Sequence, residues 1–145
     1  MTTVEKLAAL RALMRENGLS AYIVPGTDPH ASEYMAAHWT ETTWLSGFNG
    51  EAGTVVVTLD KAKLFTDSRY YLQAGIELEG TTIELMRASD IDCPSINQWL
   101  IDEAAAQLDV VAKPLDEASE MLVVGVNPEM WSVNEYKAMK EEFAE

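Results

Sequence analysis

The spacing of apolar and polar residues along this chain predicts helices and short strands in alternation. Apolar residues that recur every three or four positions indicate amphipathic helices, and short β-branched or apolar runs indicate strands. An α/β fold is therefore expected. The expected elements are a helix from Val4 to a stop at Gly18, strands at 21–24, 54–59, 64–66, 81–86 and 121–126, a short irregular helix at 28–39, and helices at 68–78, 95–108 and 132–143.

Signals at the ends of these elements support the pattern. Thr2 with Glu5, and Ser132 with Glu135, have the spacing of capping boxes, which mark helix N-termini. Residues 60–61 separate two β-branched runs and predict a hairpin turn, although they lack the glycine of the strongest turn signal. A hairpin within an alternating chain predicts a mixed sheet.

The chain has the composition of a globular protein with a large acidic excess. It is 145 residues long and 48% hydrophobic, and 24 acidic against 10 basic residues give a net charge of −14. Nucleic-acid binding is not expected, because it depends on clustered Lys and Arg. The ordinary explanation of such acidity is solubility, and the alternative is attraction of a basic partner or a cationic substrate.

Cellular setting is indicated by cysteine usage and by the absence of targeting signals in the sequence. Cys93 is the only cysteine, so an internal disulfide is impossible and a reduced, cytoplasmic setting is expected. No signal segment and no apolar run of membrane-spanning length is evident, so no membrane partner is expected.

The glycine-punctuated segment that follows Trp44 is the first candidate for chemistry. Gly47, Gly50 and Gly53 are three apart, which is not the spacing of a dinucleotide-binding or Walker loop. They also lead into a β-branched strand rather than into a phosphate-binding helix N-terminus. A structural role in tight turns and close backbone approach is therefore expected.

Histidines and nucleophiles give little support for catalysis within the chain. His30 with Glu33, and His38 with Glu41, are i, i+3 pairs, but a metal site needs three or four convergent ligands. We therefore expect no metal site, and we expect His30 to fix a loop through hydrogen bonds. No nucleophile elbow is present, and Cys93 lacks a nearby histidine.

Asp67 and Arg69 are the most suggestive polar pair. Asp67 is placed to cap the helix at 68–78, and the pair could simply be a structural ion pair. The alternative is that Arg69 reaches outward to bind a carboxylate or a neighbouring domain, for which its planar guanidinium is well suited.

The segment from Trp44 to Ala74, with its glycine loop and its Thr-Asp-Ser-Arg-Tyr-Tyr-Leu-Gln-Ala helix start, resembles the first domain of long, three-domain Xaa-Pro aminopeptidases (aminopeptidase P). Further agreement lies at 19–25, 28–34 and 124–128, so the resemblance covers nearly the whole chain. The chain departs from the usual family pattern at Asn49, Glu51, Ser68 and Tyr71.

The resemblance implies a three-layer, ribonuclease H-like creatinase/prolidase N-terminal domain with a mixed central sheet. We expect it to span residues 1–131, with 132–145 forming a C-terminal helix toward a missing second domain. It implies a non-catalytic domain that frames the substrate entrance of an enzyme that removes an N-terminal residue standing before proline. Arg69, His30 and Asp67 are then the candidates for the substrate channel or the interdomain contact.

The family's catalytic centre implies further features of the longer protein. Two divalent metal ions, manganese and possibly zinc, are expected in a missing C-terminal domain, and none in this chain. Peptide substrate, the catalytic domain and a second copy of the enzyme are the expected partners. The alternatives are a protein-interaction module from a catalytically inactive relative, such as the large subunit of the FACT histone chaperone, and a free-standing small-molecule-binding domain.

Overall fold

The computed structural model describes residues 1–27, 29–30, 36–111 and 123–144, and side-chain placement is described for these residues except 107–111 and 144. Within this part of the chain, five strands form one sheet in the order β4-β3-β2-β1-β5. The strands are β1 (Ala21–Val24), β2 (Thr54–Thr58), β3 (Ala62–Thr66), β4 (Glu84–Arg87) and β5 (Val124–Val126).

The sheet is mixed, as the sequence predicts. β2 pairs antiparallel with both β1 and β3, whereas β5 is parallel to β1 and β4 is parallel to β3. The β2–β3 hairpin is closed by Thr58, whose hydroxyl accepts a 2.9 Å hydrogen bond from the Lys61 backbone and donates a 3.0 Å bond to Asp60. These directions place the carboxyl ends of β1, β3, β4 and β5 at one edge of the sheet.

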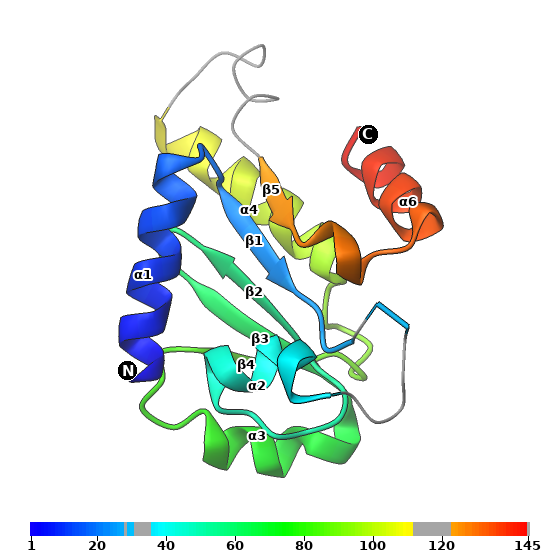
Figure 1. The fold of residues 1–145 in the computed structure, drawn as a ribbon. Helices are drawn as coiled ribbons and strands as arrows, with labels where there is room; N and C mark the ends of the chain where they lie inside the picture. Colours follow the sequence, from blue (N-terminus) through cyan, green and yellow to red (C-terminus); the bar gives the residue numbers. More distant parts are fainter. Residues whose placement is uncertain (28, 31–35, 112–122, 145) are drawn as a thin grey trace.

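Helices cover both faces, giving the expected three layers (Figure 1). One face carries α1 (Thr3–Glu16), α2 (Glu41–Ser46) and α3 (Tyr71–Glu77), and the other carries α4 (Ile96–Val111) and α6 (Val133–Ala144). The capping boxes predicted at Thr2–Glu5 and Ser132–Glu135 are both present.

Alternation along the strands divides the core into two clusters. Leu7 and Met14 of α1 pack with Val55 and Val57 of β2 on the first face, around the fully buried Phe48. On the second face, Trp99 of α4 packs with the strand residues whose side chains point the other way: Ala21, Ile23, Val56 and Phe65. Because each buried strand residue contributes to one cluster only, the register of the sheet is fixed by burial on both sides.

The predicted strand at 81–86 is wrong in its first half. β4 begins only at Glu84, because Thr81 and Thr82 form a turn after α3. The Thr81 hydroxyl donates a 2.6 Å hydrogen bond to the Leu78 carbonyl, and Thr82 has a positive φ of 66°. β-Branched residues suggested a strand here, but local side-chain hydrogen bonding and turn geometry prevail.

The segment around α2 differs from what the sequence led us to expect. The helix α2 itself was not expected, since its short run of Thr and Trp residues has no clear helical periodicity. Within the irregular helix expected at 28–39, the structure describes a turn at 29–30 and a 3₁₀ helix at Ala37–Trp39. Residues 28 and 31–35 lie outside the described residues, as do residues 121–122 of the last predicted strand.

Candidate functional site

Asp67 and Arg69 lie directly after β3, at the edge where four strands end. Ligands of α/β sheets commonly bind beyond the carboxyl ends of the strands, so this is where a site is expected on general grounds. Asp67 caps a 3₁₀ helix at Ser68–Tyr70, which leads into α3.

The structure confirms that Asp67 and Arg69 form an ion pair. Nε of Arg69 lies 2.9 Å from Oδ1 of Asp67, and a second guanidinium nitrogen donates to Oδ2 at 2.9 Å. The Arg69 backbone N–H also donates to Oδ1, at 3.1 Å. The guanidinium is thus held by a two-pronged contact on the same carboxylate that caps the helix.

Although paired, the Arg69 side chain stays accessible. It is 70% exposed, against 33% for Asp67, and its guanidinium lies 5.1 Å from the ring centre of Tyr70. Two of the five N–H groups of the guanidinium are used by Asp67, so the others can donate outward. The ion pair and an outward-facing role for Arg69 are therefore compatible.

Hydrogen bonding from Arg69 holds the pKa of the Asp67 carboxyl below its ordinary value. The same contact raises the pKa of Arg69 above its ordinary value, chiefly through its hydrogen bond to Asp67. Both groups are consequently charged at neutral pH, and the pair offers a preoriented cation rather than a proton donor.

The glycine loop supports this edge, as the structural interpretation predicts. A Cβ at Gly26, after β1, would lie 2.2 Å from the carbonyl oxygen of Gly53, so the two backbone segments touch. Thr66 at the end of β3 donates a 2.5 Å hydrogen bond to the carbonyl of Ala52. The loop is thereby fastened to the two strands that flank β2.

His30, the third sequence candidate, lies in a turn after β1 and is exposed. It belongs to a different segment from Asp67 and Arg69, and its i, i+3 partner Glu33 is outside the described residues. The second such pair does not form a ligand set: Glu41 accepts a 3.4 Å hydrogen bond from Asn127, and the ring of His38 packs edge-on against Trp39.

Sequence reasoning missed a polar network beside Arg69. The hydroxyl of Tyr71 accepts a 2.9 Å hydrogen bond from the backbone of Ser89 and lies 3.4 Å from a carboxylate oxygen of Asp90. Arg87 pairs with Asp90 at 2.9 Å and lies over the Tyr71 ring at 4.4 Å. The i, i+3 spacing of Arg87 and Asp90 was a visible signal, but nothing in the sequence brings Tyr71 to them across 18 residues.

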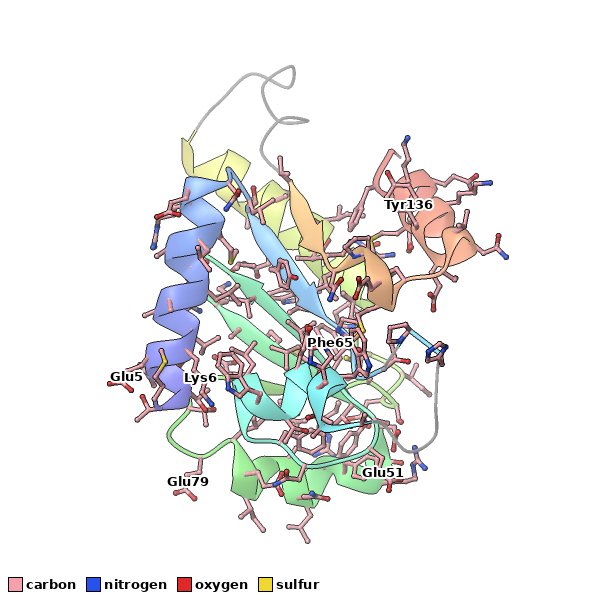
Figure 2. The ribbon with its side chains drawn as sticks, in the orientation of Figure 1. Glu5, Lys6, Glu51, Phe65, Glu79 and Tyr136 are labelled. Carbon is pink, nitrogen blue, oxygen red and sulfur yellow. The ribbon has the colours of Figure 1, made fainter. Side chains whose placement is uncertain are left out.

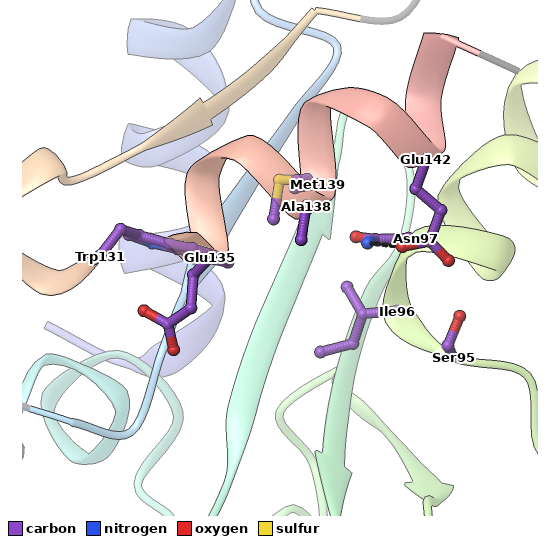
Figure 3. Close-up of a pocket in the computed structure, with 8 residues that line it drawn as sticks. All are labelled: Ser95, Ile96, Asn97, Trp131, Glu135, Ala138, Met139 and Glu142. Carbon is purple, nitrogen blue, oxygen red and sulfur yellow. Dashed lines mark hydrogen bonds between the residues drawn. The ribbon is translucent and has the colours of Figure 1, made fainter. Parts of the chain in front are cut away.

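Surface hollows are also present away from the Asp67–Arg69 pair. One, of about 300 Å³, separates α4 from α6 and is lined by Ile96, Trp131 and Met139 among others. A hydrogen bond from the Asn97 amide to Glu142 crosses between its two helices (Figure 3). None of the three sequence candidates lines this hollow.

A di-nuclear metal centre does not fit the side chains that the structure describes. Within 1–27, 29–30, 36–106 and 123–143, no three His, Cys, Asp or Glu residues converge closely enough to hold a metal ion. In the same part of the chain, no helix has the length and apolar character needed to cross a bilayer.

Comparison with known proteins identifies the fold. The family described as Creatinase/Prolidase N-terminal domain matches residues 6–145. The chain is 40% identical over 141 residues to a probable Xaa-Pro aminopeptidase P of Pyricularia oryzae, covering 97% of this chain and 20% of that protein. Xaa-Pro aminopeptidase 2 of Rattus norvegicus is 37% identical over 142 residues, covering 98% of this chain and 18% of the relative.

Solved structures agree with the sequence relatives. The X-prolyl aminopeptidase of Caenorhabditis elegans, described as a cytosolic enzyme with a di-nuclear active site, matches 99% of this chain and 23% of its own, with a TM-score of 0.82 and 31% identity. The N-terminal domain of a metallopeptidase from Corynebacterium diphtheriae has the same fold, with a TM-score of 0.61 at 19% identity over 97% of this chain and 87% of its own. This chain spans about a fifth of the curated relatives it matches, and it belongs to the creatinase/prolidase N-terminal domain family.

Proposed function

We propose that this chain is the non-catalytic N-terminal domain of a metal-dependent Xaa-Pro aminopeptidase, here called the parent enzyme. The observation that carries the proposal is similarity along nearly the whole chain to proteins of that name, at 40% identity and, in a solved structure, a TM-score of 0.82. The parent enzyme removes an N-terminal residue that is followed by proline, and it works in the cytoplasm.

In this proposal the two metal ions, manganese or zinc, are bound by the catalytic domain of the parent enzyme, and they supply the activated water for hydrolysis. The residues described here do not fit that centre. Their task is to frame the entrance through which a peptide N-terminus approaches. The domain's partners are the catalytic domain, the peptide and a second copy of the parent enzyme.

Arg69 is the residue through which we propose that the domain acts on substrate binding. It is exposed, permanently charged and oriented by Asp67, so it can bind a peptide carboxylate or carbonyl, or a group of the catalytic domain, without reorganising. Asp67 is a positioning residue in this scheme. His30, in the turn that follows β1, is the second candidate for the entrance.

Arg69→Ala in the parent enzyme tests this role. Losing a contact that is made equally in the bound substrate and the transition state raises KM and leaves kcat unchanged. Loss of one charge-assisted hydrogen bond should raise KM about tenfold. Arg69→Lys keeps the charge but loses the planar guanidinium, so its KM should lie between those of the wild type and Arg69→Ala. Unchanged peptide kinetics together with unchanged thermal stability in Arg69→Ala would remove Arg69 from both the entrance and the interdomain contact.

A further inference from the structure

A cavity between α1 and α2 lies outside the Asp67–Arg69 site and has its own chemistry. Its volume is about 370 Å³, with β1 as its floor. Pockets that bind small ligands span roughly 300–1,000 Å³ and are mostly apolar with a few placed polar groups. The uncharged lining residues are Ala9, Leu10, Leu13, Tyr22, Val24, Trp44 and Leu45, and the charged ones are Lys6 and Glu41.

Trp44 forms a fixed wall of this cavity although its side chain is 61% exposed. Nζ of Lys6 donates a 2.6 Å hydrogen bond to the Trp44 carbonyl and lies 4.5 Å from the centre of its ring. Figure 2 shows Lys6 reaching from α1 toward α2. The positive charge of Lys6 at the rim of the cavity is therefore already paired with the carbonyl and the ring of Trp44.

Glu41, by contrast, has unused capacity to accept hydrogen bonds. It is the first residue of α2, is half-buried, and accepts one long hydrogen bond of 3.4 Å from Asn127. Among the side chains that the structure describes, no Lys or Arg forms an ion pair with it. An ionised carboxylate in an apolar recess favours a cation as its partner.

Tyr22 completes the polar end of the cavity. Burial and the nearby Glu41 charge raise the pKa of the Tyr22 hydroxyl, so this group stays neutral beside the carboxylate. The ring is seated against Gly125 of β5, where a Cβ would come within 2.8 Å of it. The floor of the cavity is thus held in place by the sheet.

We propose that this cavity binds a small primary ammonium ion with an apolar body, its nitrogen on Glu41 and its body against Leu13, Leu45 and Trp44. The net charge of −14 draws cations toward the protein and repels anions of the same shape. The site is separate from the role proposed for Arg69, so either can fail without the other.

Titration of the 145-residue chain with L-leucinamide, followed by amide chemical shifts, tests the proposal. At about pH 6.5 the ligand's amine is protonated, since α-amino groups have pKa values of roughly 7.7–8.0. We expect saturable shifts in α1, α2 and β1, and none with N-acetyl-L-leucinamide, which lacks the charge. A tripeptide with an N-terminal leucine separates the two sources: tighter binding identifies a peptide terminus, and weaker binding identifies a free amine.

Glu41→Gln should weaken L-leucinamide binding about tenfold, as loss of a charge-assisted bond implies. Glu79→Gln is the matched control, because it changes the net charge equally at an exposed position outside the cavity lining. Leu13→Ser, at a side chain 56% exposed, removes apolar contact without disturbing the core and should also weaken binding. Equal binding of the acetylated compound, equal loss in both Glu variants, or no saturable shift in the wild-type chain would overturn the proposal.

Discussion

Arg69 combines fixed orientation with exposure, and Asp67 supplies the hydrogen bonds that orient it. Both carboxylate oxygens of Asp67 accept from its guanidinium, and one of them also caps the backbone of the same short helix. An arginine on an open surface samples many rotamers, and ordering one of them costs conformational entropy. Asp67 meets that cost before any substrate or domain arrives.

Asp67→Asn tests this charge pairing in the 145-residue chain. Because the folded-state pKa of Asp67 lies below the ordinary 3.8, the pair contributes stability that is fully present above that value and is lost as pH falls through the lowered pKa. We expect Asp67→Asn to lower the urea midpoint near neutral pH and to match the wild type in strong acid. Asparagine can still cap the helix, so the substitution removes the charge and one of the two guanidinium hydrogen bonds while keeping the cap.

The difference between the two urea midpoints, measured across the acidic range, decides this prediction. A difference that stays constant as pH falls would mean that the Asp67 charge contributes nothing. Since the pair is exposed, the effect should also shrink in high salt.

At the scale of elements, the edge beyond β1 and β3 is built by backbone contact. Gly26 follows β1 and Gly53 precedes β2, and these two strands pair with one another. The two glycines approach so closely that no side chain fits at position 26. Thr66 fastens the same loop from the other side. The glycine loop is therefore held against the end of β3, directly before Asp67 and Arg69.

Gly26→Ala should destabilise the domain strongly. The new Cβ would lie 2.2 Å from the Gly53 carbonyl oxygen, a backbone atom that cannot move aside as a flexible side chain could. Gly75→Ala is the matched control: nothing lies within 4 Å of its Cβ, and alanine in a helix interior gains about 0.5–1 kcal/mol.

Chemical denaturation of both variants provides the measurement. We expect a lower midpoint for Gly26→Ala and an unchanged or higher one for Gly75→Ala. If the two substitutions shifted the midpoint alike, close backbone packing could not be the reason for glycine at position 26.

Elements with strong periodicity or caps were predictable from sequence, and short irregular ones were not. The capping boxes at Thr2 and Ser132 and the β2–β3 hairpin are local signals, and the structure confirms them. The turn at Thr81–Thr82 and helix α2 depend on side-chain hydrogen bonds and on packing under β1, which periodicity does not report.

The candidate site shows the same division. Asp67 and Arg69 are two residues apart, so their pairing could be inferred from the sequence alone. Tyr71 meets Ser89 and Asp90 only because β4 lies beside β3, and the cavity between α1 and α2 depends on a helix that was not predicted. Contacts across the sheet can be predicted only when the strand order is known, and local sequence patterns do not reveal that order.

For the whole molecule, the three layers and the mixed sheet define a domain without a metal centre in its described residues, within a family whose sequence relatives are about five times longer. In the function that we propose, hydrolysis belongs to the parent enzyme and this chain frames its substrate entrance. The acidic surface fits this task, since peptide N-termini carry a positive charge.

Hydrolysis of an Xaa-Pro peptide, measured for the purified 145-residue chain and for the parent enzyme with added manganese, tests the proposed division of labour. We expect turnover by the parent enzyme and none by the 145-residue chain at any manganese concentration, while the chain remains folded by circular dichroism. Robust turnover by the chain alone would overturn the proposed function, and so would a folded, metal-loaded parent protein that hydrolyses no Xaa-Pro peptide.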